Sequence, residues 1–163
     1  MKKTIIAITA IMAMISCNRS NPFFSEWDTP YGIPPFEQIQ ERDYLPAVKE
    51  GIARQQAEIQ AIIDNPEAPD FENVIAAMDR SGALLGKVIG VLFNVSESDS
   101  NDNLNKIVET AMPLISEHSS SINMNAALFA KVKAVYEADQ SGLSREQQML
   151  LKDTYDSFVE NGI

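Results

Sequence analysis

The stretch Asp70–Val95, DFENVIAAMDRSGALLGKVIGVLFNV, decides the fold of this 163-residue chain. Its apolar residues recur at spacings of three and four, which is the period of an α-helix with one buried face. The residues on that face are Phe71, Val74, Ile75, Met78, Leu85, Ile89 and Leu92. Asp70 is of the type that caps helix N-termini. The stretch therefore predicts one long amphipathic helix that begins after Asp70.

Two glycines interrupt this stripe. Gly82 lies at its centre and Gly86 at its edge. A glycine inside a helix costs about 1 kcal/mol relative to alanine, so we expect close approach of a neighbouring helix to compensate at Gly82. Leu84, Val88 and Val91 lie outside the stripe, which makes the helix apolar on two sides. Such helices are usually sandwiched, so we also expect cover from outside these residues.

The rest of residues 43–163 repeats the helical period. Upstream, Asp43 is a candidate cap, Pro46 lies in the expected first turn, and the apolar stripe runs from Leu45 to Ile63. Downstream, further helical stripes are carried by Leu104–Ile122, Leu128–Tyr136 and Met149–Val159. Turns are expected at Asp64–Pro69 and Ser96–Asp102, a kink at Pro113, and a capping box at Ser144–Gln147. Because no segment alternates like a strand, the sequence predicts an all-α fold of about five packed helices.

Residues 17–42 are a polar spacer followed by an arm rich in proline and aromatic residues. Pro22–Phe36, PFFSEWDTPYGIPPF, holds four prolines and five aromatic side chains. Proline at this density disfavours helix, and so many aromatic rings favour burial. We expect an extended arm that packs over the helical body; direct membrane contact is the less favoured alternative.

Residues 1–16 are typical of a bacterial signal peptide. A basic start, Lys2-Lys3, precedes an apolar run of 11 residues, Ile5–Ile15, which is too short to span a bilayer. Met14–Cys17, MISC, is similar to a lipobox, although Met14 stands where leucine is usual. The sequence predicts that Cys17, the only cysteine, is lipidated and anchors an exported protein in the periplasm or at the outer membrane. The alternative is an ordinary signal peptide cleaved elsewhere.

The charge of the chain makes a nucleic-acid partner improbable on physical grounds. Removing residues 1–16 takes away Lys2 and Lys3, so that 11 basic and 23 acidic residues remain and the net charge is about −12. A surface of this sign repels phosphate backbones.

His118, the only histidine, continues the apolar stripe of Leu104–Ile122 and is expected to be a structural residue on a packed face. Zinc sites normally need three or four His, Cys, Asp or Glu ligands, and the single cysteine is already assigned to lipidation. The acidic loop Ser96–Asn103 lacks the calcium-loop pattern, and no serine near His118 lies in a nucleophile-elbow context. The sequence therefore assigns no catalytic or metal-binding residue; Gly82 and Pro113 are also assigned structural roles.

Five blocks in a fixed order resemble a known family. They are NPFFSEWDTPYGIPPFEQI (21–39), DYLPAVKEGIARQQAEI (43–59), PDFENVIAAMDRSGALL (69–85), PLISEHSSSINMNAALFAKVKAVY (113–136) and LSREQQMLLKDTYDSFVENGI (143–163). Together they are similar to the N-terminal region of the thimet-oligopeptidase family of zinc metallopeptidases, especially its bacterial peptidyl-dipeptidase branch. The resemblance runs from about Asn21 to Ile163.

The resemblance implies a larger, helical, two-lobed peptidase with a deep channel, part of whose wall this region would form. Such an enzyme would use zinc held by an H-E-x-x-H motif to release C-terminal dipeptides from oligopeptides. One histidine cannot supply that motif, so zinc is expected only in a longer parent protein, and residues 43–163 are expected to be incomplete. The alternative is a stand-alone, non-catalytic helical lipoprotein that binds or regulates a partner.

Overall fold

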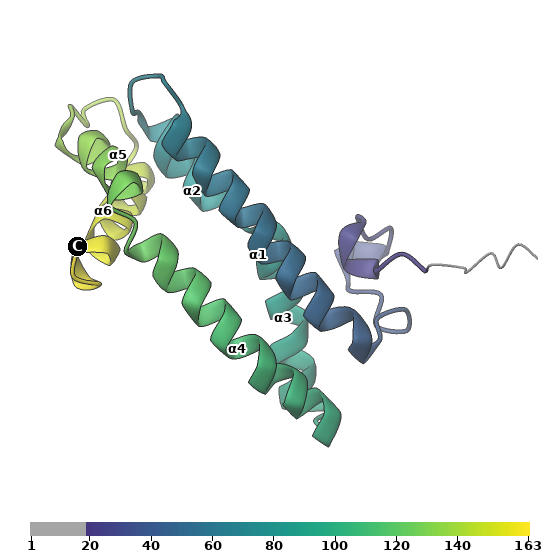
Figure 1. Cartoon of the computed structure of the whole chain (residues 1–163). Coiled ribbons are helices and arrows are strands. Elements are labelled where there is room, and N and C mark those ends of the chain that lie inside the picture. The colour runs from purple at the N-terminus through teal and green to yellow at the C-terminus, as the bar shows by residue number, and fades with distance from the viewer. Residues whose placement is uncertain (1–18) are drawn as a thin grey trace, which may run out of the picture.

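The computed structural model describes residues 19–163 and contains helices without a strand among them (Figure 1). The all-α fold predicted from the sequence is confirmed. Its elements are η1 (Pro22–Phe24), η2 (Pro30–Gly32), α1 (Glu41–Asp64), η3 (Phe71–Ala76), α2 (Ala77–Arg80), α3 (Ala83–Ser98), α4 (Asp102–Asn123), α5 (Ala126–Glu137) and α6 (Arg145–Glu160).

Helix α1 begins two residues before the expected cap. Gln40 is the N-cap, and Asp43 is the third helical residue, whose carboxylate accepts a hydrogen bond from the Gln40 backbone N–H at 2.8 Å. Asp43 thus closes a capping box instead of starting the helix. Pro46 consequently lies in the second turn, beyond the positions where a missing N–H has no helical partner.

The prediction of a single helix after Asp70 is wrong. Asp70 does cap a helical start, but the segment divides into η3, α2 and α3, with a break at Ser81 and Gly82. Gly82 has φ 72° and ψ 19°, a left-handed conformation that glycine adopts readily. The apolar stripe crosses this break because its first half faces one core cluster and its second half faces another.

The remaining helices follow the sequence pattern with shifted ends. Helix α3 continues to Ser98, and Asn101 caps α4, so the expected Ser96–Asp102 loop shortens to three residues. Helix α4 continues through Pro113 as one helix (Figure 1). Ser144 caps α6 in the predicted capping box with Gln147.

Two apolar clusters form the interior, and α1 contributes to both. The first cluster contains Phe23, Tyr44, Ala47, Val48, Leu85, Val88, Val91, Leu92, Leu104, Ile107 and Ala111. The second cluster contains Ile59, Ile62, Phe71, Val74, Ile75, Ala76, Leu128, Val132, Val135, Leu151 and Phe158. The N-terminal half of α1 therefore shares the first cluster with α3 and α4, and its C-terminal half shares the second cluster with η3, α5 and α6.

The second apolar side of α3 is covered by the chain itself. Val88 and Val91 are buried in the first cluster together with Phe23 from the arm, and Leu84 and Trp27 pack against it. The cover that we expected from outside Asp70–Val95 is thus supplied in part by η1 of the arm.

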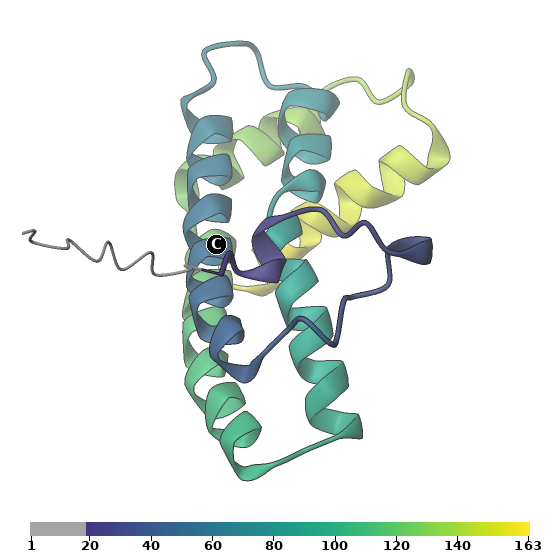
Figure 2. The ribbon, with the colours of Figure 1, turned by 90° about the vertical axis from the view of Figure 1, so that its right-hand side faces the viewer.

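The arm lies on one side of the bundle, as predicted, and contains two single 3-10 turns that each begin at a proline (Figure 2). Phe23 is buried and Trp27 is half-buried, but Phe24, Tyr31 and Phe36 are exposed. The expectation that the aromatic rings would all be buried is thus only partly met.

Candidate functional site

The break between α2 and α3 forms a polar junction with α1 and α4. We call Gln55, Glu58, Ser81, Gly82 and His118 the junction site. Gln55 and Glu58 lie one turn apart and so share a face of α1. The Gly82 backbone N–H donates to Glu58 Oε2 at 2.7 Å, and Gln55 Nε2 donates to Ser81 Oγ at 3.2 Å. Glu58 therefore satisfies the Gly82 N–H that the helix break releases, and Gln55 binds the neighbouring Ser81 hydroxyl.

His118 reaches this junction from α4. Only 4% of the residue is exposed, and its Nε2 lies 2.9 Å from Gln55 Oε1. Because an amide oxygen can only accept, the imidazole donates through Nε2 and its Nδ1 carries the lone pair. Nδ1 is buried and has no hydrogen-bond partner within residues 19–163, and burial lowers the pKa of His118. The geometry therefore favours a neutral imidazole.

A cavity of about 370 Å³ lies beside the junction site, between α3 and α4. Its lining residues are Gln55, Gly82, Leu85, Gly86, Ile89, Ile115, His118, Ser119, Ile122 and Asn123. The lining is largely aliphatic, with a few amide and hydroxyl groups. Because His118 Nδ1, the nitrogen that carries the lone pair, is buried away from solvent, this imidazole is not placed to act as a general base on a molecule in the cavity.

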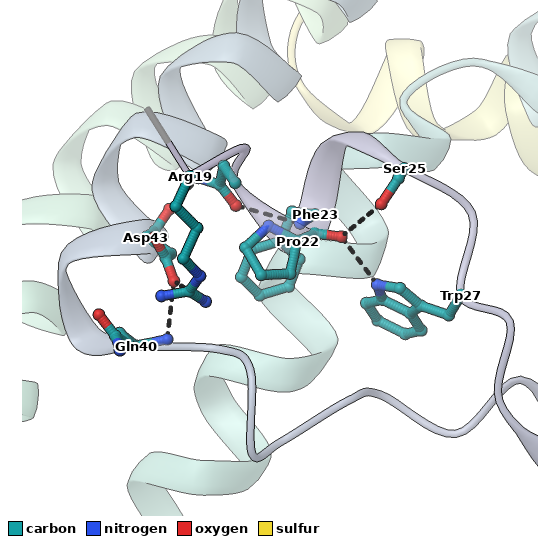
Figure 3. A network of polar contacts seen from close by, with 8 residues as sticks. Arg19, Pro22, Phe23, Ser25, Trp27, Gln40 and Asp43 are labelled. Atoms are coloured by element: carbon teal, nitrogen blue, oxygen red, sulfur yellow. Dashed lines mark hydrogen bonds and ion pairs between the residues drawn. The ribbon is translucent and has the colours of Figure 1, made fainter. Parts of the chain in front are cut away.

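A second polar network fixes the start of the arm on α1 (Figure 3). Arg19 Nη2 lies 3.3 Å from Asp43 Oδ2, and Asn21 Nδ2 donates to the Asp43 carbonyl oxygen at 2.8 Å. Farther along, Trp27 Nε1 donates to the Pro22 carbonyl oxygen at 3.0 Å. The start of the arm is therefore held to α1, and the Trp27 side chain is bonded back to the arm itself.

Lys87 of α3 holds the same arm from a second helix. Its Nζ donates to the Ser25 carbonyl oxygen at 2.8 Å and lies 3.9 Å from the centre of the Trp27 ring. This geometry combines a charged hydrogen bond with a cation–π contact. Burial lowers the pKa of Lys87.

The residues singled out from the sequence have different surroundings. Cys17 lies outside the described residues. His118 and Gly82 meet at the junction site, joined through Gln55, whereas Pro113 lies exposed on α4. The sequence reasoning missed Gln55 and Glu58. Their i, i+3 spacing was visible, but nothing in the sequence marked them as partners of a helix break.

The described part of the chain does not fit a zinc site. Among residues 19–163, no group of three or more His, Cys, Asp or Glu side chains is placed to hold a metal ion. Glu41 is instead bonded to Asn101 and Asn103, and these hydrogen bonds, that from Asn103 first, lower the pKa of its carboxyl group. Within the same residues, no helix is long and apolar enough to cross a membrane.

Comparison with known proteins relates the chain to bacterial peptidases. The dipeptidyl carboxypeptidase of Salmonella typhimurium is 37% identical over 144 residues, which is 88% of this chain and 21% of the relative. The Escherichia coli dipeptidyl carboxypeptidase is 38% identical over 143 residues, 87% of this chain and 21% of the relative. Oligopeptidase A of Salmonella typhimurium is 21% identical over 136 residues, 83% of this chain and 20% of the relative. No family model matches the chain.

These matches place the chain among peptidase sequences. More particularly, the chain matches the N-terminal region of dipeptidyl carboxypeptidases of the thimet-oligopeptidase family, as its sequence predicts. The chain spans about a fifth of the length of these relatives.

Proposed function

We propose that this chain is the N-terminal helical portion of an exported zinc metallopeptidase that releases dipeptides from the C-termini of oligopeptides. The observation that carries the proposal is 37–38% identity to dipeptidyl carboxypeptidases over nearly nine-tenths of the chain. Because the described residues do not fit a zinc site, the metal and the catalytic groups would belong to another part of the protein.

Within that protein, the chain would line part of the substrate channel and supply shape without chemistry. The aliphatic cavity between α3 and α4 is one surface that fits this role. An oligopeptide carrying a photoreactive phenylalanine near its C-terminus should label residues of 19–163 in the protein made from the whole reading frame. Labelling confined to residues outside this range would contradict the channel-wall role.

Activity gives the primary test. Dipeptide release from an unstructured oligopeptide should be measured for the 163-residue chain and for the product of the whole reading frame, each with and without a zinc chelator. We expect chelator-sensitive release only from the longer product. Zinc-dependent hydrolysis by the 163-residue chain, or a stop codon directly after Ile163, would contradict the proposal.

We also propose that a lipid on Cys17 anchors the protein in the periplasm or at the outer membrane. The lipobox-like MISC sequence after the apolar run Ile5–Ile15 supports this proposal. Mass spectrometry of the native N-terminal peptide should find acyl chains on Cys17, and Cys17→Ser should move the protein into the soluble fraction. Cys17→Ser protein that stays with membranes would contradict lipid anchoring.

One observation favours a second candidate, a stand-alone helical lipoprotein that binds a partner. Val88 and Val91 are buried by the arm of the same chain, so α3 does not need another polypeptide to cover its second apolar side. This candidate predicts a stable monomer at micromolar concentration and a stop codon after Ile163.

A further inference from the structure

We propose that the arm side of the protein docks on a zwitterionic lipid surface, with Tyr31, Ile33, Phe36 and Phe24 as the lipid-facing patch. These four residues are called the arm patch. The inference rests on the lipid anchor proposed above. It concerns where the folded protein lies at the membrane, whereas the anchor itself only retains it there.

The tether between a lipid on Cys17 and the folded protein would be short. Only Asn18 separates Cys17 from Arg19, so the tether from Cys17 to Arg19 spans at most about 7 Å. Arg19 is already fixed to α1 through Asp43 at 3.3 Å, and Asn21 is bonded to the Asp43 carbonyl oxygen. A lipid on Cys17 would therefore hold the folded surface near Arg19 close to the headgroups.

The arm lies near this attachment point. Figure 1 places the arm and the start of the described chain on the same side of α1. In Figure 1, helix α6 lies on the opposite side of the bundle from the arm. The arm is thus the part of the protein that a short tether would bring to the bilayer first.

Four large apolar side chains of the arm are exposed. Phe24, Ile33 and Phe36 are 40%, 51% and 52% exposed, and Tyr31 is 100% exposed. The other exposed large apolar residues are Met112, Met124, Met149 and Val159, spread over α4, its C-terminus and α6. Scattered residues of that kind are ordinary, whereas these four fall within 13 residues of one arm, which begins beside the proposed tether.

Tyr31 has an unusual backbone conformation. Its φ is 60°, in the left-handed region that non-glycine residues rarely adopt. The turn is held by Gly32 N–H donating to the Thr29 carbonyl oxygen at 3.1 Å and by Thr29 Oγ1 donating to the Ile33 carbonyl oxygen. This turn presents a tyrosine ring that is fully exposed among residues 19–163. Tyrosine is enriched where an apolar surface meets water at membrane interfaces.

Charge selects the lipid. Glu26, Asp28 and Glu37 lie in the arm, and the net charge of about −12 that remains after removal of residues 1–16 opposes approach to an anionic bilayer. The arm patch therefore fits a zwitterionic surface better than an anionic one.

The test couples the protein lacking residues 1–16 through the thiol of Cys17, the only cysteine of the chain, to a maleimide lipid in phosphatidylcholine vesicles. Trp27→Phe removes the only native tryptophan, and Tyr31→Trp adds a probe to the arm patch. The matched control is Met149→Trp on α6, 55% exposed in the native protein, in the same Trp27→Phe background. Brominated phosphatidylcholine then reports contact with the acyl chains.

We expect the Y31W variant to shift its emission to shorter wavelength and to lose emission with brominated lipid, while the M149W variant keeps its emission. Replacing part of the phosphatidylcholine by phosphatidylglycerol should reduce the loss. Equal quenching of the two variants, or no quenching of Y31W, would overturn the docking proposal. Stronger quenching in anionic vesicles would overturn the zwitterionic preference.

A second readout applies if Trp27→Phe disturbs the fold. Trp27 of the otherwise native, Cys17-coupled protein should be quenched by brominated lipid, and Ile33→Glu should reduce that quenching. Equal quenching with and without Ile33→Glu would contradict docking through the arm patch. Because coupling is chemical, these results do not depend on native lipidation or on peptidase activity, each of which has its own measurement above.

Discussion

Gly51 of α1 and Leu85 of α3 bring the backbones of two helices into contact. A Cβ atom built on Gly51 would lie 2.9 Å from Leu85 Cα and 3.0 Å from Leu85 N. Real Cβ atoms do not approach backbone atoms so closely, so only glycine fits here without moving a helix. The first apolar cluster is organised around this crossing.

Gly51→Ala should therefore destabilise the protein by about 1–3 kcal/mol, because α1 and α3 must separate. Gly90→Ala is the matched control, since Gly90 lies inside α3 and a Cβ there would meet nothing within 4 Å. It should stabilise the protein by about 0.5–1 kcal/mol through the higher helix propensity of alanine. Urea unfolding followed by circular dichroism measures both changes. Effects of the same sign would contradict the close crossing.

Gly82→Ala should lower the free energy of unfolding by more than the strain of a left-handed alanine backbone alone would. An added Cβ at Gly82 would meet the Gln55 side chain, whereas at Gly32, which also has positive φ, it would meet nothing within 4 Å. Gly32→Ala should cost about 1 kcal/mol for the backbone conformation. Gly82→Ala should exceed that value, because Gln55 must also leave His118 and Ser81. The difference in unfolding free energy between the two variants isolates the junction, and equal costs would contradict its role.

His118 should make stability depend on pH below about 6.5. Burial lowers its folded-state pKa from 6.5, so between the folded and unfolded pKa values the unfolded chain binds more protons. Stability is then complete above the unfolded pKa and falls as pH decreases, with a slope of at most about 1.4 kcal/mol per pH unit.

His118→Gln keeps a hydrogen-bonding side chain but cannot titrate, so its unfolding free energy should be flat between pH 7 and pH 5.5. Hydrogen bonds lower the pKa values of three carboxyl groups, those of Glu41, Asp139 and Glu146. Their stabilising contributions are lost only as the pH falls below the ordinary pKa values of 4.5, 3.8 and 4.5, which lies outside this window. Denaturant titrations at several pH values measure the slopes. Parallel curves for the native protein and the variant would show that His118 is not the titrating group.

Asp43→Ala should loosen the arm and the start of α1 together. The carboxylate accepts from Gln40 N–H and pairs with Arg19, so its loss should cost about 1–2 kcal/mol. Trp27 fluorescence should shift to longer wavelength as the arm becomes hydrated. Asp28→Ala removes an exposed carboxylate from the same arm and should leave both unfolding and fluorescence unchanged. An unchanged Trp27 spectrum in Asp43→Ala would mean that Lys87 alone retains the arm.

The helical class and most helix positions could be read from the sequence because they depend on local patterns. The period of the apolar residues and the Ser144 capping box are both contained within a few turns. The break at Gly82 could not be read in the same way. The apolar stripe continues across it, since hydrophobic periodicity records that a residue is buried but not which cluster buries it.

The junction site could not be predicted from the sequence for a related reason. The pattern placed His118 on an apolar stripe, but Gln55 is 63 residues away and resembles any polar residue on a helix surface. Gly51 was missed because a glycine between Val48 and Ile52 does not reveal that another backbone crosses there. Both relationships exist only once α3 and α4 are packed on α1.

Helix α1 has a geometric consequence for the whole bundle. Its 24 residues span about 36 Å, and Val48 near one end belongs to the first cluster while Ile59 and Ile62 belong to the second. Each residue of an α-helix turns the chain by about 100°. One residue inserted between Val48 and Ile59 would rotate one cluster against the other by about that angle, even if each remained packed. The rotational phase of a single helix thus sets how the arm side faces relative to α5 and α6.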